Sequence, residues 1–164
     1  MVADFPRPGI AFRDICPLLA DAAAFEQALA SMEALARPWQ ADRIAGIESR
    51  GLIFAAALAA RMRLGLVPIR KPGKLPPATV RENYALEYGQ DGLEVQRCAF
   101  GNGHAVLLVD DVIATGGTLL AAARLVQGLG ARVVGVVGLL EIAALDGRAR
   151  LEQAGLEVRT VLRD

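Results

Sequence analysis

The sequence is poor in the features that mark secreted, disulfide-linked or metal-binding proteins. Its two cysteines, Cys16 and Cys98, lie far apart and lack the paired spacing of a zinc site or a disulfide framework. The N-terminal segment has no basic stretch followed by an apolar one, so we expect no secretory signal. The sequence therefore predicts two free thiols and a cytoplasmic location.

The sequence also lacks an excess of charge and any long apolar run. Its 18 basic and 18 acidic residues balance, so no overall field favours nucleic acid or an anionic membrane surface. The longest apolar runs, such as residues 52–60, are well short of the roughly 20 residues that span a bilayer. A hydrophobic content of 54% favours some apolar surface buried between subunits. We expect a soluble protein with one domain, residues 1–164.

Short apolar runs alternate with helical stretches along most of the chain. Residues 21–37 have apolar side chains at helical spacing, and Pro38 follows them. Further helices are expected at residues 51–62 and 118–129, with a short one near 145–155. Strands are expected at residues 43–47, 66–70, 105–109, 132–141 and 157–163. This alternation predicts an α/β fold with a central, mostly parallel sheet flanked by helices.

Residues 71–92 interrupt this alternation with prolines, glycines, charged residues and tyrosines. We expect a long loop or a mobile hairpin here. Loops of this length in a compact domain usually serve as lids over a ligand or else are disordered. The segment is therefore a candidate for a functional lid.

A pair of acids and a glycine-rich turn follow the strand expected at residues 105–109. After Asp110 and Asp111 comes a turn that we call the glycine loop, formed by Ala114, Thr115, Gly116, Gly117 and Thr118. Glycines let backbone N–H groups approach an anion, and the helix expected next adds free donors and a positive dipole end. No Lys follows the glycines as in a P-loop, and the G-x-G-x-x-G spacing is absent. The sequence predicts a phosphate site of another kind.

The two acids beside this loop indicate what else the ligand carries. A carboxylate 4 Å from a phosphate charge is repelled by about 1 kcal/mol in water, and by several times more in a partly buried site. Carboxylates do accept hydrogen bonds from hydroxyl groups, and they bind hard divalent cations. We predict a sugar phosphate, with its hydroxyls on Asp110 and Asp111 and its phosphate in the glycine loop. The alternative is an acid at a strand end that caps the next helix, beside an ordinary turn.

The stretch "DDVIATGGT" resembles the signature of the type I phosphoribosyltransferases, which bind 5-phosphoribosyl 1-pyrophosphate (PRPP). Further segments resemble, in chain order, those of the adenine phosphoribosyltransferases: "DFPRPGIAFRDICPLL", "GIESRG", "VPIRKPGKLP" and "YALEYG". The resemblance implies the type I phosphoribosyltransferase fold, with a small hood from about residues 1–20 and a flexible lid from about residues 72–92. It also implies a homodimer that makes AMP and pyrophosphate from adenine and PRPP in purine salvage. The expected cofactor is Mg²⁺, held mainly through substrate oxygens.

The pyrophosphate group carries more charge than one loop can neutralise, so a second anion site is expected. The segment "GIESRG" offers a strand end, Arg50 and a helix that begins at Gly51. The resemblance places pyrophosphate on Ser49 and Arg50, with a non-trans peptide between these two residues. It adds three cations, one of which reaches into a partner subunit's site: Arg70, Lys71 and Lys74. A surface turn is the alternative for Arg50, and a solvated side chain is the alternative for Lys74.

Transfer of the ribosyl group passes through an oxocarbenium-like state, so catalysis mainly stabilises departing pyrophosphate and positions the base. The resemblance makes Glu87 the candidate catalytic carboxylate and Tyr88 the lid tyrosine. Phe12 would stack on adenine, while backbone groups of Ala11 and Arg13 would read its edge. The alternatives are an exposed lid residue for Glu87 and an ordinary core residue for Phe12.

Two other functions stay open at this point. The first keeps the chemistry but uses guanine, hypoxanthine or xanthine, against which the "FRD" segment argues. The second is a non-catalytic regulator with this fold that senses PRPP or AMP. An appended DNA-binding segment or a basic patch would favour the regulator, and the sequence contains neither.

Overall fold

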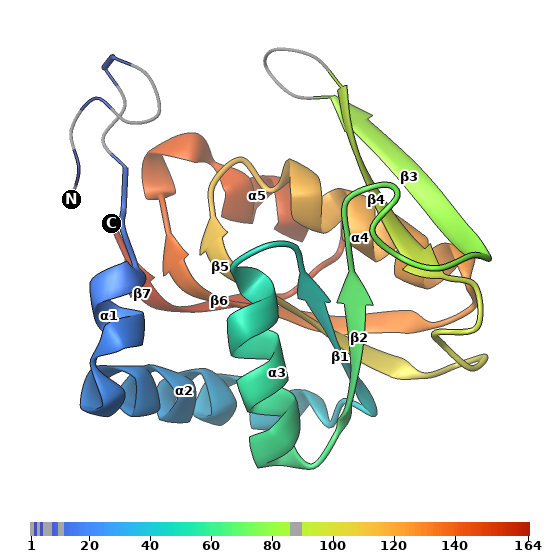
Figure 1. The fold of residues 1–164 in the computed structure, drawn as a ribbon, viewed down its shortest axis with the longest axis horizontal. Coiled ribbons are helices and arrows are strands. Elements are labelled where there is room, and N and C mark those ends of the chain that lie inside the picture. The colour runs from blue at the N-terminus through green and yellow to red at the C-terminus, as the bar shows by residue number, and fades with distance from the viewer. Residues whose placement is uncertain (1, 3, 5–7, 10–11, 86–89) are drawn as a thin grey trace.

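A five-stranded parallel sheet forms the centre of the computed structural model, which describes residues 2, 4, 8–9, 12–85 and 90–164 (Figure 1). The strand order is β2-β1-β5-β6-β7. The strands are β1 (Arg43–Ile47), β2 (Gly65–Ile69), β5 (Ala105–Ile113), β6 (Arg132–Glu141) and β7 (Val158–Arg163). Because all neighbouring strands are parallel, their carboxyl ends meet at one edge of the sheet. The predicted α/β fold is confirmed.

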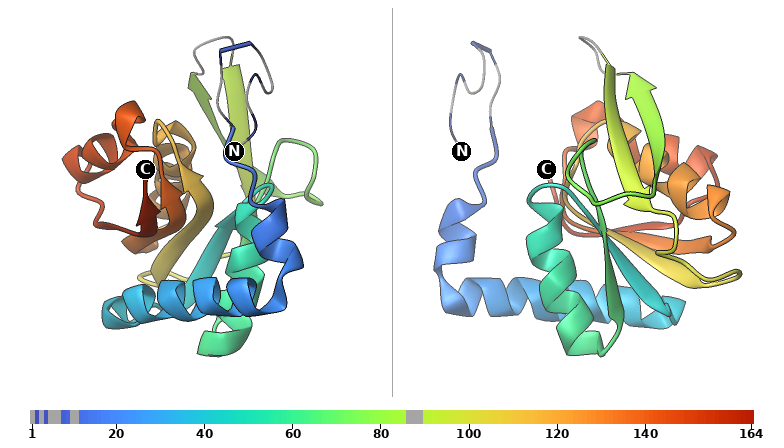
Figure 2. Two further views of the ribbon diagram at one scale, coloured as in Figure 1. Left: turned by 90° about the vertical axis from the view of Figure 1, so that its left-hand side faces the viewer. Right: turned by 45° about the vertical axis from the view of Figure 1, so that its right-hand side comes forward.

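Helices cover both faces of this sheet (Figures 1 and 2). They are α1 (Cys16–Ala20), α2 (Ala22–Ala36), α3 (Gly51–Met62), α4 (Gly117–Gly128) and α5 (Gly147–Gln153), with 3-10 turns η1 (Arg37–Trp39) and η2 (Ala143–Leu145). Alternate residues of β5 enter two separate cores. Leu107 and Val109 pack with α2 and α3, whereas Val106 and Leu108 pack with α4. β5 is therefore covered on both faces, as its nearly continuous apolar sequence predicts.

Strand β5 continues further than its apolar run predicts. We expected it to end at Val109, but it runs on through both acids to Ile113. The extension is held by β6, which pairs Val112 with Leu140 and Ile113 with Glu141. Pairing with a long neighbouring strand therefore outweighs the low strand preference of two consecutive aspartates.

The segment at residues 71–92 contributes to a hairpin above the sheet. β3 (Thr79–Ala85) pairs in antiparallel orientation with β4 (Gln90–Gln96), so the expectation of a hairpin is confirmed for the described residues. Leu93 and Val95 of β4 are buried in the same core as α4. A backbone bridge between Arg70 and Glu94 fastens the hairpin to the end of β2. The hairpin therefore stands at the carboxyl edge of the sheet.

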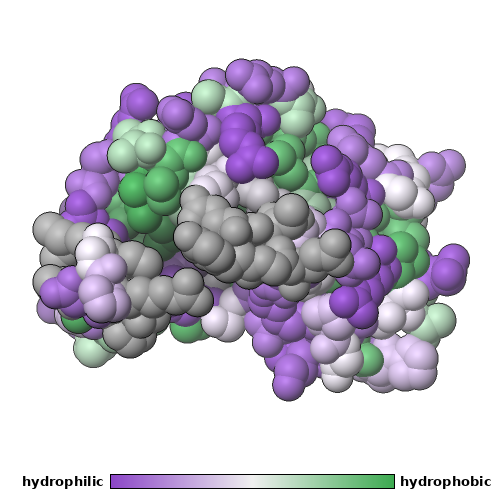
Figure 3. All heavy atoms as spheres, turned by 90° about the horizontal axis from the view of Figure 1, so that it is seen from above, coloured by the Kyte–Doolittle hydropathy of each residue, from purple (hydrophilic) through white to green (hydrophobic). Residues whose placement is uncertain are grey.

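The described residues of the N-terminal segment lie at this same edge (Figure 1). Val2 and Phe12 form an antiparallel bridge with backbone N···O distances of 2.9 and 2.8 Å. Arg13 forms an ion pair with Asp164, and helix α1 follows, which we did not predict. Figure 3 looks down on this edge and shows hydrophobic side chains gathered in a recess between polar ones.

Both Cys16 and Cys98 are exposed free thiols, as predicted. Within the described ranges, no helix has the length and apolar character needed to cross a bilayer.

Candidate active site

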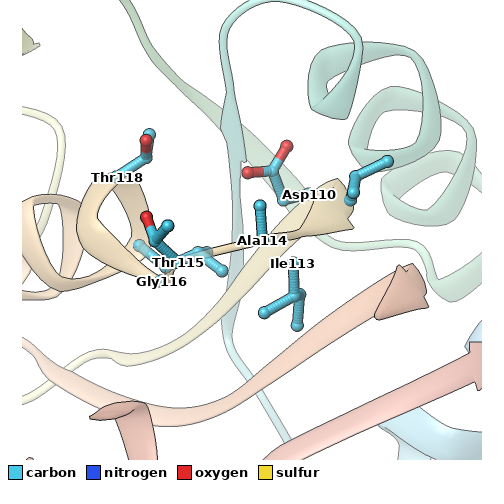
Figure 4. A pocket seen from close by; sticks show the side chains of 8 residues that line it. Asp110, Ile113, Ala114, Thr115, Gly116 and Thr118 are labelled. Atoms are coloured by element: carbon cyan, nitrogen blue, oxygen red, sulfur yellow. The ribbon is translucent and has the colours of Figure 1, made fainter. Parts of the chain in front are cut away.

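The glycine loop connects the end of β5 to the start of α4. Gly116 is the N-cap residue of α4 and has a φ of 77°, a left-handed conformation that glycine adopts without the strain a side chain would bring. A small cavity of about 60 Å³ lies above the loop and is lined in part by Asp110, Thr115 and Thr118. Figure 4 shows the Asp110 carboxylate on one side of this cavity and the two threonines on the other. The predicted strand, acids, loop and helix are therefore arranged around one pocket.

The start of α4 carries the electrostatic features of an anion site. In the described part of the chain, no side chain caps the N-terminus of this helix, and its first turn contains no acid. The first amides of a helix have no intrahelical acceptor, and the helix dipole places partial positive charge at this end. These donors are therefore available to a phosphate group.

The two acids of β5 have different surroundings. Asp110 lines the cavity, and its Oδ1 accepts a hydrogen bond of 2.9 Å from the amide of Asp111. Burial, together with the negative charge of Asp111, raises the pKa of Asp110 well above its ordinary value. Asp111 is only 6% exposed, and its Oδ2 lies 2.5 Å from Nε of Arg50. One acid thus faces the cavity, and the other is paired with a predicted pyrophosphate residue.

Arg50 connects three predicted parts of the site. Besides its ion pair with Asp111, its guanidinium lies 5.2 Å from the ring centroid of Phe12, close enough for a cation–π contact. The next residue, Gly51, begins α3 so near the acids that a Cβ there would lie 2.6 Å from Oδ1 of Asp110. The structure therefore brings together residues that are widely separated in sequence. It also corrects one expectation, because the cis peptide bond lies between Glu48 and Ser49, not between Ser49 and Arg50.

The other predicted cations also lie at this edge of the sheet. Arg70 donates to both carboxylate oxygens of Glu48, with N···O distances of 3.2 Å. Although burial raises the pKa of Glu48, hydrogen bonds from the Lys71 amide and from Arg70 lower it below the ordinary value. The Lys71 ammonium forms an ion pair with Asp91 of the hairpin. The side chains of Ser49 and Lys74 are exposed.

Tyr84 is a site residue that the sequence did not single out. Its hydroxyl accepts a hydrogen bond of 3.4 Å from Thr118 of the glycine loop and donates one of 3.1 Å to Asp91. The hairpin is thereby connected to the start of α4. The sequence gives little sign of this contact, because Tyr84 lies 34 positions before its partner Thr118.

Ala11, Glu87 and Tyr88 lie outside the described residues, so their roles stay predictions. The side chain of Arg13, predicted to act through its backbone, is occupied by its ion pair with Asp164. Across the parts of the chain that are described, no three His, Cys, Asp or Glu side chains are grouped so that they could hold a metal ion.

Comparison with known proteins agrees with this geometry. Residues 21–154 match the family model described as "Phosphoribosyl transferase domain". The adenine phosphoribosyltransferase of Polynucleobacter asymbioticus is 51% identical over 162 residues, which cover 99% of this chain and 94% of that protein. The chain therefore belongs to the type I phosphoribosyltransferase family and falls among its adenine phosphoribosyltransferases.

Solved structures of such enzymes share the whole fold. The Rhodothermus marinus adenine phosphoribosyltransferase matches with a TM-score of 0.93 and 45% identity, covering 99% of this chain and 92% of that one. The Saccharomyces cerevisiae enzyme, solved with adenine and an imino-altritol bisphosphate, matches with a TM-score of 0.91 and 36% identity. This match covers 97% of this chain and 91% of the yeast chain.

Proposed function

We infer that this chain is an adenine phosphoribosyltransferase of purine salvage. In its reaction the bond from C1 of the ribose to a pyrophosphate oxygen breaks, a bond from C1 to N9 of adenine forms, and the N9 proton is released. The observation that carries this inference is the open N-terminus of α4 beside the two acids of β5, with Arg50 paired to Asp111. The yeast relative, solved in complex with adenine and an imino-altritol bisphosphate, supports the same choice of base.

We propose that the glycine loop holds the 5-phosphate of the donor. Its support is the uncapped start of α4, where amides and the helix dipole favour an anion. Asp110 and Asp111 would accept hydrogen bonds from the two ribose hydroxyls. We propose that Asp111 exchanges its contact with Arg50 for these hydroxyls, which would link ribose binding to the release of that arginine.

We propose that the freed Arg50 then binds pyrophosphate, together with Ser49, Arg70, Lys71 and Lys74. The support is that these residues lie at the same edge of the sheet and that three of them already hold carboxylates. A pyrophosphate group would replace those carboxylates as the partner of each cation. The donor alone carries both the hydroxyls that attract Asp111 and the phosphates that attract Arg50. Binding of the donor could therefore replace the Arg50–Asp111 ion pair in a single event.

We propose that adenine lies against the ring of Phe12, with backbone groups of Ala11 and Arg13 at its edge. The support is the position of Phe12 beside Arg50, which puts an aromatic face next to the proposed pyrophosphate residue. Glu87 is proposed to accept or hold the proton of the purine ring, and Tyr88 to belong to the lid over it.

The proposal includes Mg²⁺, bound mainly to oxygens of pyrophosphate and ribose. The donor set supports this arrangement, because Asp110 and Asp111 are a pair of carboxylates without a third acidic, histidine or cysteine ligand grouped with them among the described residues. When bound, the ion would neutralise charge on the leaving group.

We also propose a cytoplasmic homodimer. Two exposed thiols favour a reducing compartment, and one of Arg70, Lys71 and Lys74 is proposed to reach a partner's site.

A competition experiment tests the function directly. The purified protein is supplied with PRPP, Mg²⁺ and an equimolar mixture of adenine, guanine, hypoxanthine and xanthine, and the nucleotides formed are separated. We expect AMP to form at least 100-fold faster than the other nucleotides. Turnover with another base would refute adenine as the substrate. Binding of PRPP without any turnover would favour the regulatory protein instead.

A further inference from the structure

The glycine loop rests directly on helix α5, an element outside every motif that pointed to the site. A Cβ atom placed on Gly147, the first residue of α5, would lie 2.1 Å from the carbonyl oxygen of Ala114 and 3.0 Å from the amide nitrogen of Gly116. In the opposite direction, a Cβ on Gly116 would lie 2.9 Å from the Gly147 carbonyl oxygen. The two backbones therefore touch, with no room for a side chain between them.

Helix α5 is itself fixed to the sheet by an ion pair with a buried carboxylate. Arg148 donates from Nη2 to Oε2 of Glu141 at 2.6 Å and from Nη1 to the carbonyl oxygen of Val158 at 2.6 Å. Glu141 is only 2% exposed, and the Arg148 guanidinium lowers its pKa below the ordinary value. Leu151 of α5 is fully buried. The surface on which the loop rests is thus held by both polar and apolar contacts.

One side chain of α5 reaches into the loop. Nη1 of Arg150 donates a hydrogen bond of 2.9 Å to the carbonyl oxygen of Thr115. That oxygen and the N–H of Gly116 belong to the same peptide unit. A cationic donor on a carbonyl polarises its peptide, so the N–H at the other end becomes a stronger donor. The bond also fixes the direction in which this N–H points.

We propose that α5 is the support of the glycine loop and that Arg150 is a positioning residue for the 5-phosphate. Gly147 lets the loop lie close to α5, and Arg150 orients and polarises the peptide between Thr115 and Gly116. Neither residue touches the ligand. The inference rests on the proposed binding of phosphate by this loop and adds the element that shapes it.

Paired titrations of AMP and adenosine test the role of Arg150, because the two ligands differ only in the 5-phosphate. Calorimetry on the intact protein gives the ratio of the two affinities. We expect Arg150→Met to reduce this ratio about fivefold, the effect of one hydrogen bond. Arg150→Lys, which keeps a charged donor, should restore part of it. Affinity for inorganic pyrophosphate and KM for adenine should stay unchanged, while KM for PRPP rises about fivefold.

Gly147→Ala tests the close packing, with Gly128→Ala as its control. Both replace a helical glycine, but a Cβ on Gly128 meets no atom within 4 Å. We expect the AMP-to-adenosine ratio to fall at least 20-fold in Gly147→Ala and to stay within twofold in Gly128→Ala. If Gly147→Ala does not fold, the Arg150 variants still decide the proposal, because Arg150 is exposed.

The outcomes separate this inference from the proposed function. A wild-type protein that binds AMP no more tightly than adenosine would refute phosphate binding itself. A wild-type protein that prefers AMP, with the full preference kept in Arg150→Met, would refute the positioning role alone. Equal losses for AMP, adenosine and pyrophosphate in Arg150→Met would show a general structural defect and would also overturn it.

Discussion

The two proposed anion sites at the carboxyl edge of the sheet are built in opposite ways. The glycine loop offers backbone amides at the uncapped start of α4, and its shape is set by contact with α5. The pyrophosphate side offers side-chain cations, and three of these already form ion pairs: Arg50 with Asp111, Arg70 with Glu48, and Lys71 with Asp91. On the proposed function, the glycine loop could bind its anion directly, whereas the cations of the pyrophosphate side would first exchange their internal partners.

This difference assigns distinct tasks to the two sites. A rigid cradle of amides binds a phosphate with little rearrangement, which suits the end of the donor that does not react. Cations that carry internal counter-ions are not left as unpaired, partly buried charges in the empty enzyme. In the proposed reaction they would become available as the donor binds, at the end where charge develops on the leaving group.

The largest effect on activity is expected at Asp110 and Asp111. Replacing both Asp110 and Asp111 with Asn should lower kcat/KM for PRPP at least about 100-fold, because the ribose hydroxyls lose their charged acceptors. Asn remains an acceptor of similar shape, so the fold should persist. Steady-state kinetics and circular dichroism measure the two effects. Near-normal activity would refute the role assigned to these acids.

The single variant Asp110→Asn tests the stability cost of the acid that lines the cavity. Because the pKa of Asp110 is raised in the folded protein, the native state binds this proton more tightly than the unfolded chain does. The carboxylate therefore costs stability progressively as the pH rises above about 4. We expect Asp110→Asn to melt at a higher temperature than the wild type at pH 7 and at a similar one at pH 4. A lower melting temperature at pH 7 would contradict the account.

An intermediate effect, on stability, is expected at the ion pair between Glu141 of β6 and Arg148 of α5. This pair fixes α5, the proposed support of the glycine loop, to the sheet. Glu141→Gln removes the buried charge that Arg148 contacts and should lower the free energy of unfolding at pH 7 by about 2 kcal/mol. The pKa of Glu141 is lowered in the fold, so its contribution is present above its unfolded pKa and is lost as the pH falls through the folded one. Urea unfolding at several pH values should show the difference from wild type shrinking below about pH 4. A pH-independent difference would contradict this assignment.

The smallest effect is expected from removing an internal counter-ion. Asp91→Asn frees Lys71 and should strengthen pyrophosphate binding about threefold, since such partly exposed ion pairs are weak. Glu82→Gln is the control, because it removes a charge from the same hairpin but from a pair with Arg124. Calorimetric titration with pyrophosphate compares the two variants. Weaker binding in Asp91→Asn would show that Asp91 positions Lys71 rather than competing for it.

The sequence predicted the arrangement of the glycine loop better than that of the pyrophosphate side. Acids, glycines and a helix start are neighbours in the chain, so local rules place them together, and the structure agrees. The partner of Arg50 is Asp111, 61 residues away, and only the packing of α3 against β5 brings them into contact. The same limit explains why Tyr84, Gly147 and Arg150 were missed. Each acts through a tertiary contact that no local pattern encodes.

A crystal structure of the complex with AMP tests the central claim most directly. The account predicts the 5-phosphate within hydrogen-bond distance of the amides of residues 115–118, the ribose hydroxyls on Asp110 and Asp111, and Arg50 released from Asp111. A phosphate bound elsewhere, or a nucleotide bound while Arg50 and Asp111 stay paired, would contradict it.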